Sequence, residues 1–273
     1  MRDTKLIFVE GLPGSGKTTT AAWLASRLHS ERLMVNLWLE HQPEHPLNVG
    51  GTLHPSGSTT GEAFFHRYTP ASFVQESLQR WQAFVRTALQ AEALSVLDSY
   101  PFQNTVRVLL QLHASPDCMR EYAGQVEALV MPLQPVLMYF NHRDLTYAFH
   151  HLSTISAQHG KSWTDYVVEL VTHCPYAMAR HLEGFSGALA VLSDYKQLTD
   201  ALLRQSRCPR IVLEDCAGGW EECYQQIEAC IGLAEQITSG SWTVKAAKEQ
   251  RRPPRSALAF GGMGDCKEHA RRC

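Results

Sequence analysis

The sequence predicts an α/β fold in which helices cover both faces of a parallel sheet. Three observations lead to this prediction. Short, nearly continuous apolar runs recur along the chain, segments with the period of an amphipathic helix lie between them, and the first run leads directly into a glycine-rich turn. Apolar runs without polar alternation are typical of strands buried on both faces, and the alternation of strand and helix is typical of βαβ units.

Five apolar runs rich in Val, Ile, Phe or Trp are expected to form the sheet. In chain order they are Lys5–Glu10, Leu33–Glu40, Ala93–Asp98, Pro135–Asn141 and Pro209–Glu214. After the first run, Ala21, Leu24, Ala25 and Leu28 fall on one helical face, and residues 71–92 repeat apolar residues at similar spacing. We therefore expect one helix after the first strand and a longer one before the third.

Two internal segments interrupt the expected alternation of strands and helices. Residues 43–61 follow the second strand and are rich in Gly, Pro, Ser and Thr, so they are expected to form a long loop, which in compact domains is usually functional or disordered. Residues 161–203 are expected to form several helices between the fourth and fifth strands. Cys174–Pro175 and Gly184 mark the expected interruptions in this helical insert.

Charge is distributed unevenly along the chain. The formal net charge is −2 over 273 residues, but eight Lys and Arg stand against three Asp and Glu from Gly240 onward, which leaves 17 basic and 24 acidic residues in the body. An acidic body argues against broad nucleic-acid binding, which usually needs a basic face. Because periodicity fades into Pro, Gly and clustered Arg, we expect a domain over 1–239 and a disordered basic tail over 240–273.

The eight cysteines are scattered and form no C-x-x-C pair. With no signal-like N-terminus and no apolar run long enough to span a bilayer, the sequence predicts a reduced, soluble, cytoplasmic protein. Cys216, Cys223 and Cys230 are seven residues apart, which is too wide for one metal and is expected to place small residues on one helix face. The thirteen histidines, including the pair at 150–151, match no metal-binding spacing, so scattered surface histidines are favoured.

One short stretch carries the strongest functional signal. Residues 11–18, GLPGSGKT, satisfy G-x-x-x-x-G-K-[ST] between an apolar strand and an amphipathic helix. In such a loop, glycines let backbone N–H groups turn toward phosphate oxygens and the helix adds its positive N-terminal end. Lys17 would reach the β- and γ-phosphates and the Thr18 hydroxyl would coordinate Mg²⁺. The alternative is an ordinary glycine turn. The expected nucleotide-binding residues are Gly11, Pro13, Gly14, Ser15, Gly16, Lys17, Thr18 and Thr19.

The stretch VEGLPGSGKTTT resembles the phosphate-binding loop of the thymidylate kinase and deoxynucleoside kinase group of the P-loop kinase superfamily. Glu10, the glycines, Lys17, Thr18 and Thr19 match its pattern x-E-G-x-x-G-x-G-K-[ST]-T. The resemblance implies a three-layer P-loop NTPase fold with a five-stranded parallel sheet and a helical lid or insert. It also implies ATP with Mg²⁺ as phosphoryl donor and an acceptor held at the carboxyl ends of the strands. The resemblance in sequence covers the first strand, the loop and the helix that follows. Over the rest of the chain only the expected order of strands and helices resembles these kinases.

Two acidic residues end predicted strands and are candidates for phosphoryl transfer. Asp98 stands where a Walker B carboxylate would hold the metal, although the Ser-Tyr-Pro that follows also suits a helix start. Glu40 closes the second strand where deoxynucleoside kinases carry the glutamate of an E-P motif, which accepts the proton of the attacking hydroxyl. Here His-Gln-Pro follows Glu40, so the match is one of position. A strand-end acid that faces water explains Glu40 equally well.

The acceptor site is less well marked. In the resembling kinases an arginine that binds phosphate follows the position of Asp98, whereas here the next residue is Ser99. Arg107 could partly replace this arginine, although a solvated helix arginine is at least as good an interpretation, and Tyr100 is a further acceptor-site candidate. Phe64–Tyr68 would suit an acceptor wall, but a core helix is favoured. The missing arginine favours an acceptor that arrives as a hydroxyl rather than as a monophosphate.

Many P-loop kinases close an arginine-bearing lid between their last two strands. The corresponding residues 142–161 contain Arg143 and Lys161 but no R-x-x-x-R cluster, so Arg143 or Arg180 would have to supply the transition-state cation. After the last strand, Ala217–Gly219 is a candidate edge for the purine, although any strand-to-helix turn would look similar.

These residues predict an ATP-dependent phosphotransferase that moves the γ-phosphate to a small-molecule acceptor such as a nucleoside or nucleotide. Lys17, Asp98, Glu40 and Arg143 are the expected catalytic residues, and Thr18 with Asp98 the expected Mg²⁺ ligands. The alternative is a nucleotide-binding regulatory ATPase or switch that acts through a protein partner, and the acidic body disfavours a nucleic-acid end kinase. No membrane partner is expected, and a homodimer is left open.

Overall fold

The computed structural model describes residues 4–40, 42–50, 61–146, 163–214, 216 and 219–237. These residues belong to a compact unit that spans Met1–Thr238. It is an α/β fold built on a five-stranded, all-parallel sheet. The strands are β1 Leu6–Gly11, β2 Val35–Trp38, β3 Leu94–Asp98, β4 Val136–Asn141 and β5 Arg210–Glu214. Each strand overlaps one of the five apolar runs, which confirms the predicted α/β class and parallel sheet.

Helices connect these strands along the described part of the chain. They are α1 Lys17–Ser30, α2 Gly61–Arg67, α3 Pro70–Gln90, α4 Arg107–Gln111, α5 Pro116–Val130, α7 Trp163–Thr172, α8 Pro175–Ala179, α9 Gly184–Gln205 and α10 Trp220–Ile237. A π-helical segment, η1 Phe102–Val106, leads into α4, and a 3-10 segment, η2 Met131–Leu133, precedes β4. None of these helices is long and apolar enough to cross a bilayer.

The strand order β2-β3-β1-β4-β5 places β1 at the centre of the sheet. It pairs with β3 on one side and with β4 on the other, so that Val9 lies opposite Asp98 and Gly11 opposite Phe140. All six residues of β1 are buried. A strand with helices above and below has no solvent-facing side, and this is why its sequence is apolar without alternation.

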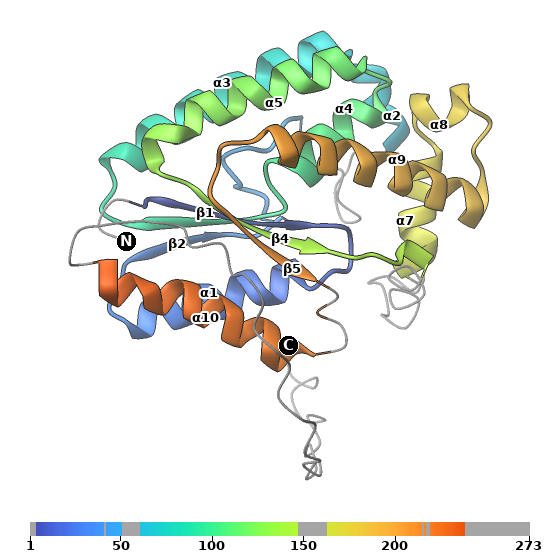
Figure 1. Ribbon diagram of the computed structural model, residues 1–273. Helices are drawn as coiled ribbons and strands as arrows, with labels where there is room; N and C mark the ends of the chain where they lie inside the picture. The colour runs from blue at the N-terminus through green and yellow to red at the C-terminus, as the bar shows by residue number, and fades with distance from the viewer. Residues whose placement is uncertain are drawn as a thin grey trace, which may run out of the picture. The chain divides into compact units, whose positions relative to one another are not determined.

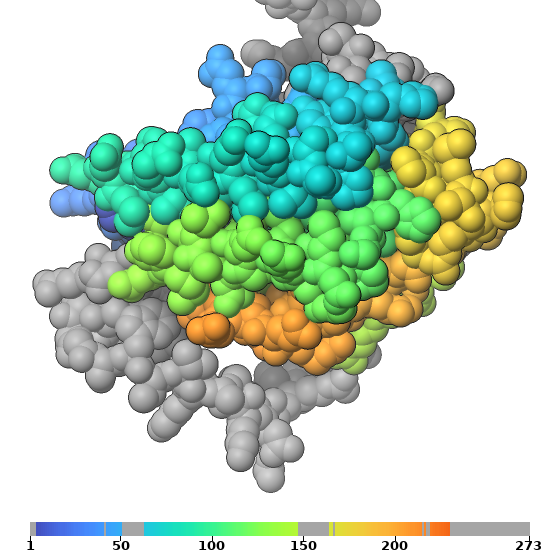
Figure 2. Space-filling view, turned by 90° about the horizontal axis from the view of Figure 1, so that it is seen from above, coloured from blue at the N-terminus to red at the C-terminus, as the bar shows by residue number. Residues whose placement is uncertain are grey.

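Alternate residues of β1 contribute to two separate hydrophobic cores. Leu6 and Phe8 join the core formed with α3, α5 and α9, whereas Ile7 and Val9 join the core formed with α1 and α10. Figure 1 shows these two helical layers on opposite faces of the sheet. Seen from the side of the larger core, α3, α5 and α9 lie next to one another, with α7 and α8 gathered at one end (Figure 2).

The helix boundaries agree with several local signals in the sequence. The helical pattern over 71–92 is α3, which begins after Thr69, whose side chain accepts a hydrogen bond from the Ser72 N–H. The predicted interruptions are confirmed, because α8 begins at Pro175 and α9 at Gly184. Within the predicted loop over 43–61, residues up to 50 form turns and bends rather than helix or strand. Residues 51–60 and the tail over 240–273 lie outside the described residues.

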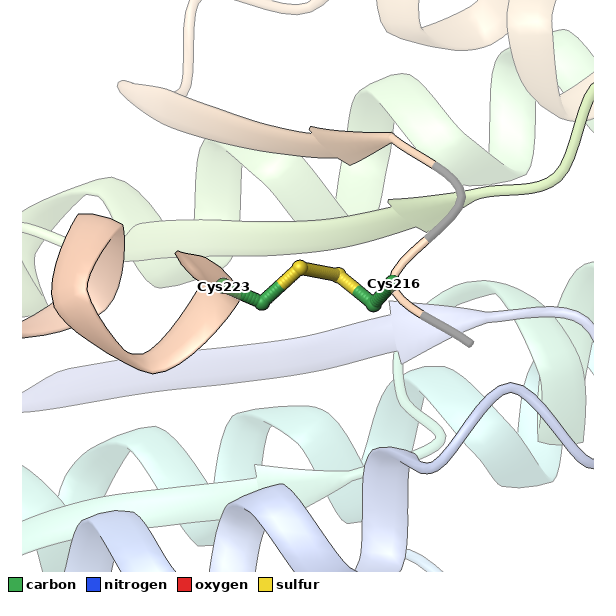
Figure 3. The surroundings of a disulfide bond; sticks show 2 residues. All are labelled: Cys216 and Cys223. Carbon is green, nitrogen blue, oxygen red and sulfur yellow. A yellow bond between two sulfur atoms is a disulfide. The ribbon is translucent and has the colours of Figure 1, made fainter. Parts of the chain in front are cut away.

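The expectation that the cysteines are reduced is wrong for one pair. Cys216 and Cys223 form a disulfide across a Cα–Cα distance of 5.9 Å (Figure 3). Their spacing of seven was expected to place both on one face of a helix. Cys216 instead precedes α10, and the chain turns between β5 and α10 so that Cys216 lies against the first turn of that helix. The described cysteines Cys118, Cys174 and Cys208 are free thiols.

Candidate functional site

The sheet topology identifies one edge as the expected place for a ligand. The connection from β1 passes through α1 on one face of the sheet, whereas the connection from β3 passes through η1, α4 and α5 on the other face (Figure 1). Adjacent strands whose connections leave to opposite faces form a topological switch point, and ligands of open α/β sheets bind beyond the carboxyl ends of such strands. The predicted residues that follow β1 and end β3 lie at this edge.

The segment Gly11–Thr18, called the glycine loop below, has the backbone that its glycines allow. Gly11, Gly14 and Gly16 have φ values of 149°, 77° and 86°, a region that favours glycine. A Cβ atom on Gly11 would lie 2.7 Å from the carbonyl oxygen of Phe140. Gly16 is the N-cap of α1, and no side-chain hydrogen bond caps the N–H groups of the first turn. The loop therefore ends at a helix start that no side chain of its N-cap residue caps, and such helix starts favour anions.

Two polar side chains of the glycine loop, those of Ser15 and Lys17, are buried. The Ser15 hydroxyl has no hydrogen-bond partner among the described residues. Lys17 is only 4 % exposed, and its ammonium donates to the carbonyl oxygen of Leu12 at 2.7 Å. Burial lowers the pKa of Lys17, and the nearby carboxylates of Asp98 and Glu40 oppose this change. A buried ammonium and an orphaned hydroxyl in one loop are groups that an anion would satisfy.

Asp98 joins the glycine loop to β3. Its side chain is fully buried, and its Oδ2 atom accepts a hydrogen bond from the Thr18 hydroxyl at 2.7 Å. Burial raises the pKa of Asp98, the negative charge of Glu40 raises it further, and Lys17, Thr18 and Ser99 act in the opposite direction. A hydroxyl and a carboxylate in contact supply the hard oxygen ligands that Mg²⁺ prefers, so these residues fit the implied ion.

Glu40 is held beside Asp98 rather than facing open water. The Ser99 hydroxyl lies 3.0 Å from Glu40 Oε2 and 2.9 Å from Asp98 Oδ1, so it lies between the two carboxylates. The Gln103 amide donates to both oxygens of Glu40, at 2.9 and 3.0 Å. The structure therefore brings together Lys17, Thr18, Asp98 and Glu40.

Glu10 anchors the segment that carries Gln103. It is fully buried, and its Oε1 atom accepts the N–H groups of Phe102 and Gln103 at 2.6 and 3.1 Å, while Oε2 accepts the Gly11 N–H at 3.1 Å. Burial raises the pKa of Glu10 to about 7, although Lys17 and the three N–H donors oppose this rise. Sequence reasoning found Glu10 only as a motif match. Its contacts show that it joins β1 to η1.

Ser99 and Gln103 were missed as site residues. Ser99 was noted only because it replaces an expected arginine, yet it has a φ of 65° and its hydroxyl contacts two carboxylates. Gln103 lies in the π-helical segment η1, whose wider turn no spacing rule predicts. If residues 101–107 are treated as a regular α-helix, nothing in their spacing places Gln103 next to Glu40.

The predicted acceptor residues have different environments. Arg107 is 3 % exposed, so its interpretation as a solvated helix arginine is wrong. Tyr100 is buried, donates from its hydroxyl to Asn48 Oδ1 at 3.1 Å, and stacks on His45 with ring centroids 4.5 Å apart. Within the predicted wall Phe64–Tyr68, both end residues are buried in the larger core, as the preferred interpretation stated.

The predicted transition-state cations lie in ion pairs at the surface. The Arg143 side chain is 72 % exposed and donates to Glu214 Oε2 at 2.6 Å. Arg180 pairs with Asp194 at 3.0 Å. Lys161 and the first two residues of Ala217–Gly219 lie outside the described residues. The candidate site is therefore centred on the glycine loop, the end of β3 and η1.

No protein-family model matches the chain, and no curated protein matches it.

Proposed function

We propose that the chain is an ATP-dependent phosphotransferase of the P-loop kinase superfamily, resembling the thymidylate kinase and deoxynucleoside kinase group, that acts on a small-molecule acceptor. One observation carries this proposal. Lys17, Thr18, Asp98 and Glu40 come from three separate parts of the sequence and converge at the carboxyl edge of the sheet. Phosphoryl transfer needs this combination, because it depends on positioning and on charge stabilisation rather than on a covalent intermediate.

Each group has a role that follows from its environment. The N–H groups of the glycine loop and the start of α1 would bind the phosphates, and the Lys17 ammonium would exchange its bond to the Leu12 carbonyl for phosphate oxygens. Thr18 and Asp98 would hold Mg²⁺, which supplies charge neutralisation when it is bound. Since Asp98 already faces Thr18, Glu40 is the better general base for an acceptor hydroxyl, with Ser99 and Gln103 fixing its orientation.

A second candidate function is a regulatory ATPase or switch that acts through a protein partner. It is favoured by the surface positions of Arg143 and Arg180, whose ion pairs with Glu214 and Asp194 lie outside the cluster around Lys17. Transition-state cations account for about 10³–10⁵ in the rate of related enzymes, so a site without one would hydrolyse ATP slowly.

The test is transfer of label from γ-³²P-ATP in the presence of Mg²⁺ to a panel of nucleosides, nucleoside monophosphates and aminoglycoside-like alcohols. We expect label on one acceptor class, with kcat about 10²–10⁴-fold lower in Glu40→Gln, the usual contribution of a general base. Glu44→Gln is the matched control, since Glu44 is an exposed glutamate four residues further on. Label that reaches only water across the whole panel would contradict the phosphotransferase and favour the switch.

A further inference from the structure

The Cys216–Cys223 disulfide lies beyond the end of an outer strand of the sheet. Cys216 follows β5, and Cys223 belongs to α10 (Figure 3). The two cysteines are only 2 % and 4 % exposed, and they belong to the smaller core together with Leu213 of β5 and Ile227 of α10. The disulfide therefore fixes the start of α10 to the segment that leaves β5.

The start of α10 also packs on the glycine loop. Trp220 is the first residue of α10, and its indole lies over Gly16, where a Cβ atom would be 2.1 Å from Cη2. Gly16 is the N-cap of α1, the helix start that would receive the phosphates. Further along α10, Tyr224 stacks on Trp23 of α1, with ring centroids 4.3 Å apart. The loop closed by the disulfide therefore contains the residue that contacts the glycine loop.

Reduction would break one covalent link among the described cysteines, because Cys118, Cys174 and Cys208 are already free thiols. A dithiol supplies the two electrons. One of its thiolates attacks a sulfur of the Cys216–Cys223 bond, and its second thiol displaces that cysteine from the mixed disulfide. The two protons of the dithiol end on the cysteine thiols, and the reductant leaves as a disulfide. Exchange with an oxidised disulfide runs the same steps in reverse.

Burial links this exchange to the packing of Trp220. Because both cysteines are buried, a dithiol can reach their sulfur atoms only after the start of α10 has moved away from the end of β5. The same movement removes the indole from Gly16. A ligand that stabilises the packed arrangement therefore makes the disulfide harder to reduce. By thermodynamic linkage, reduction weakens the binding of that ligand by the same factor.

We propose that Cys216–Cys223 is a redox modification site that controls nucleotide binding by the glycine loop, with a dithiol as reductant and a disulfide as oxidant. In the oxidised protein the bond keeps Trp220 on Gly16. In the reduced protein the start of α10 is released, the glycine loop loses this support, and Mg·ATP binds more weakly. This control goes beyond the proposed function, because it applies to a phosphotransferase and to a switch alike, and it rests on that function only for the nucleotide.

Calorimetric titration of Mg·ATP into the full-length protein tests the control, before and after reduction with dithiothreitol. We expect the Kd to rise about 5-fold or more on reduction, as for allosteric coupling, and to return after reoxidation with oxidised glutathione. Cys223→Ser should bind as the reduced wild type does under both conditions. Cys118→Ser is the matched control, since Cys118 is a free thiol on α5, and it should keep the full response. Mass spectrometry of alkylated peptides confirms the state of each cysteine.

Hydrogen exchange without nucleotide is the second measurement. Reduction should speed amide exchange over residues 11–20 in the wild type, whereas Cys223→Ser should exchange at one fast rate under both conditions. An unchanged Kd in a protein that binds Mg·ATP, or unchanged exchange over 11–20, would overturn the proposal.

Circular dichroism checks that the fold survives. Unfolding of the wild type on reduction would show a disulfide that the fold itself requires, and it would also overturn the proposal. If Cys223→Ser does not fold, Cys216→Ala takes its place. Failure of the oxidised wild type to bind Mg·ATP would instead contradict the proposed function, and exchange over 11–20 would still decide whether the disulfide acts on the glycine loop.

Discussion

At the scale of single residues, the candidate site is a cluster of buried ionisable groups that form hydrogen bonds with protein groups. Glu10 and Asp98 are fully buried, and Lys17 is nearly so. Each carboxylate is stabilised by specific donors, which are three backbone N–H groups for Glu10 and two hydroxyls for Asp98. Burial nevertheless raises the pKa of both acids. Groups with shifted pKa values are concentrated at functional sites. Each such shift also makes the free energy of unfolding depend on pH.

Glu10 gives the clearest pH dependence. Its pKa rises from the ordinary value of 4.5 to about 7 on folding. Between these values the folded protein keeps a proton that the unfolded chain has lost, so Glu10 lowers the free energy of unfolding as pH rises through this window. The full effect, about 3 kcal/mol, is present above pH 7 and absent below pH 4.5. Relative to Glu10→Gln, the wild type should therefore lose stability between pH 5 and pH 8.

Denaturant unfolding at several pH values between 5 and 8 measures this difference. The same substitution at Glu121, an exposed glutamate on α5, is the control and should keep a constant difference from the wild type. A difference between wild type and Glu10→Gln that does not change with pH would show that Glu10 is ionised throughout, as an exposed glutamate would be.

The positions of two residues could be predicted because each follows or ends a strand. Asp98 and Glu40 could be found because the carboxyl ends of parallel strands lie at one edge of the sheet. Ser99 and Gln103 could not, because their roles depend on a left-handed residue and a π-helical turn after β3. Arg107 was noticed, but no local pattern predicts that its side chain is buried and donates to the Gln103 carbonyl and to Gln111, which links α4 to α7.

At the scale of secondary-structure elements, α10 packs against the start of α1 through one aromatic side chain. A Cβ atom on Gly16 would lie 2.1 Å from the Cη2 atom of Trp220. Trp220 also contacts Phe140 and Tyr224, with ring centroids 6.1 and 6.0 Å away. The glycine loop is therefore shaped both by its own backbone and by an indole from the last helix, a contact that the glycine pattern does not predict.

A pair of glycine substitutions tests this packing. Gly16→Ala should lower the free energy of unfolding by more than about 1–2 kcal/mol, since a left-handed φ alone costs that much and the contact with Trp220 adds to it. Gly124→Ala is the matched change within α5, where a Cβ would meet nothing within 4 Å. It should raise stability by about 0.5–1 kcal/mol, the helix-propensity gain of alanine. Equal effects of the two substitutions in thermal or denaturant unfolding would refute the contact.

At the scale of the whole molecule, the five strands could be predicted from the sequence, whereas the strand order and the disulfide could not. All five strands were found because burial on both faces leaves an unbroken apolar run. The order β2-β3-β1-β4-β5 was not predicted, since it depends on pairing between distant segments. The disulfide was also missed, because spacing alone does not show that Cys216 lies outside the helix containing Cys223. The predicted lid over 142–161 lies mostly outside the described residues and stays a prediction.

Truncation tests the predicted domain boundary. Residues Met1–Thr238 form a compact unit that contains both hydrophobic cores of the sheet. Because every described residue of these two cores lies within this unit, removal of residues 240–273 should leave the thermal midpoint and far-ultraviolet circular dichroism of the protein unchanged. A large fall in the thermal midpoint would mean that the tail contributes to the folded core. Removal of 220–273 is the contrasting variant and should unfold the protein, because it removes α10, including Cys223 and Ile227 from the smaller core.

The central claim is that the glycine loop binds Mg²⁺ and ATP through Lys17, on which both the phosphotransferase and the switch depend. Calorimetric titration of Mg·ATP into the wild type, Lys17→Ala and Lys5→Ala tests it most directly. Lys5 is the matched control, since its ammonium donates to the carbonyl oxygens of Leu89 and Ala91 at the opposite end of β1. We predict binding to the wild type and to Lys5→Ala, and binding about 10- to 100-fold weaker or lost in Lys17→Ala. Undiminished binding by folded Lys17→Ala, or no binding by the wild type, would contradict the account.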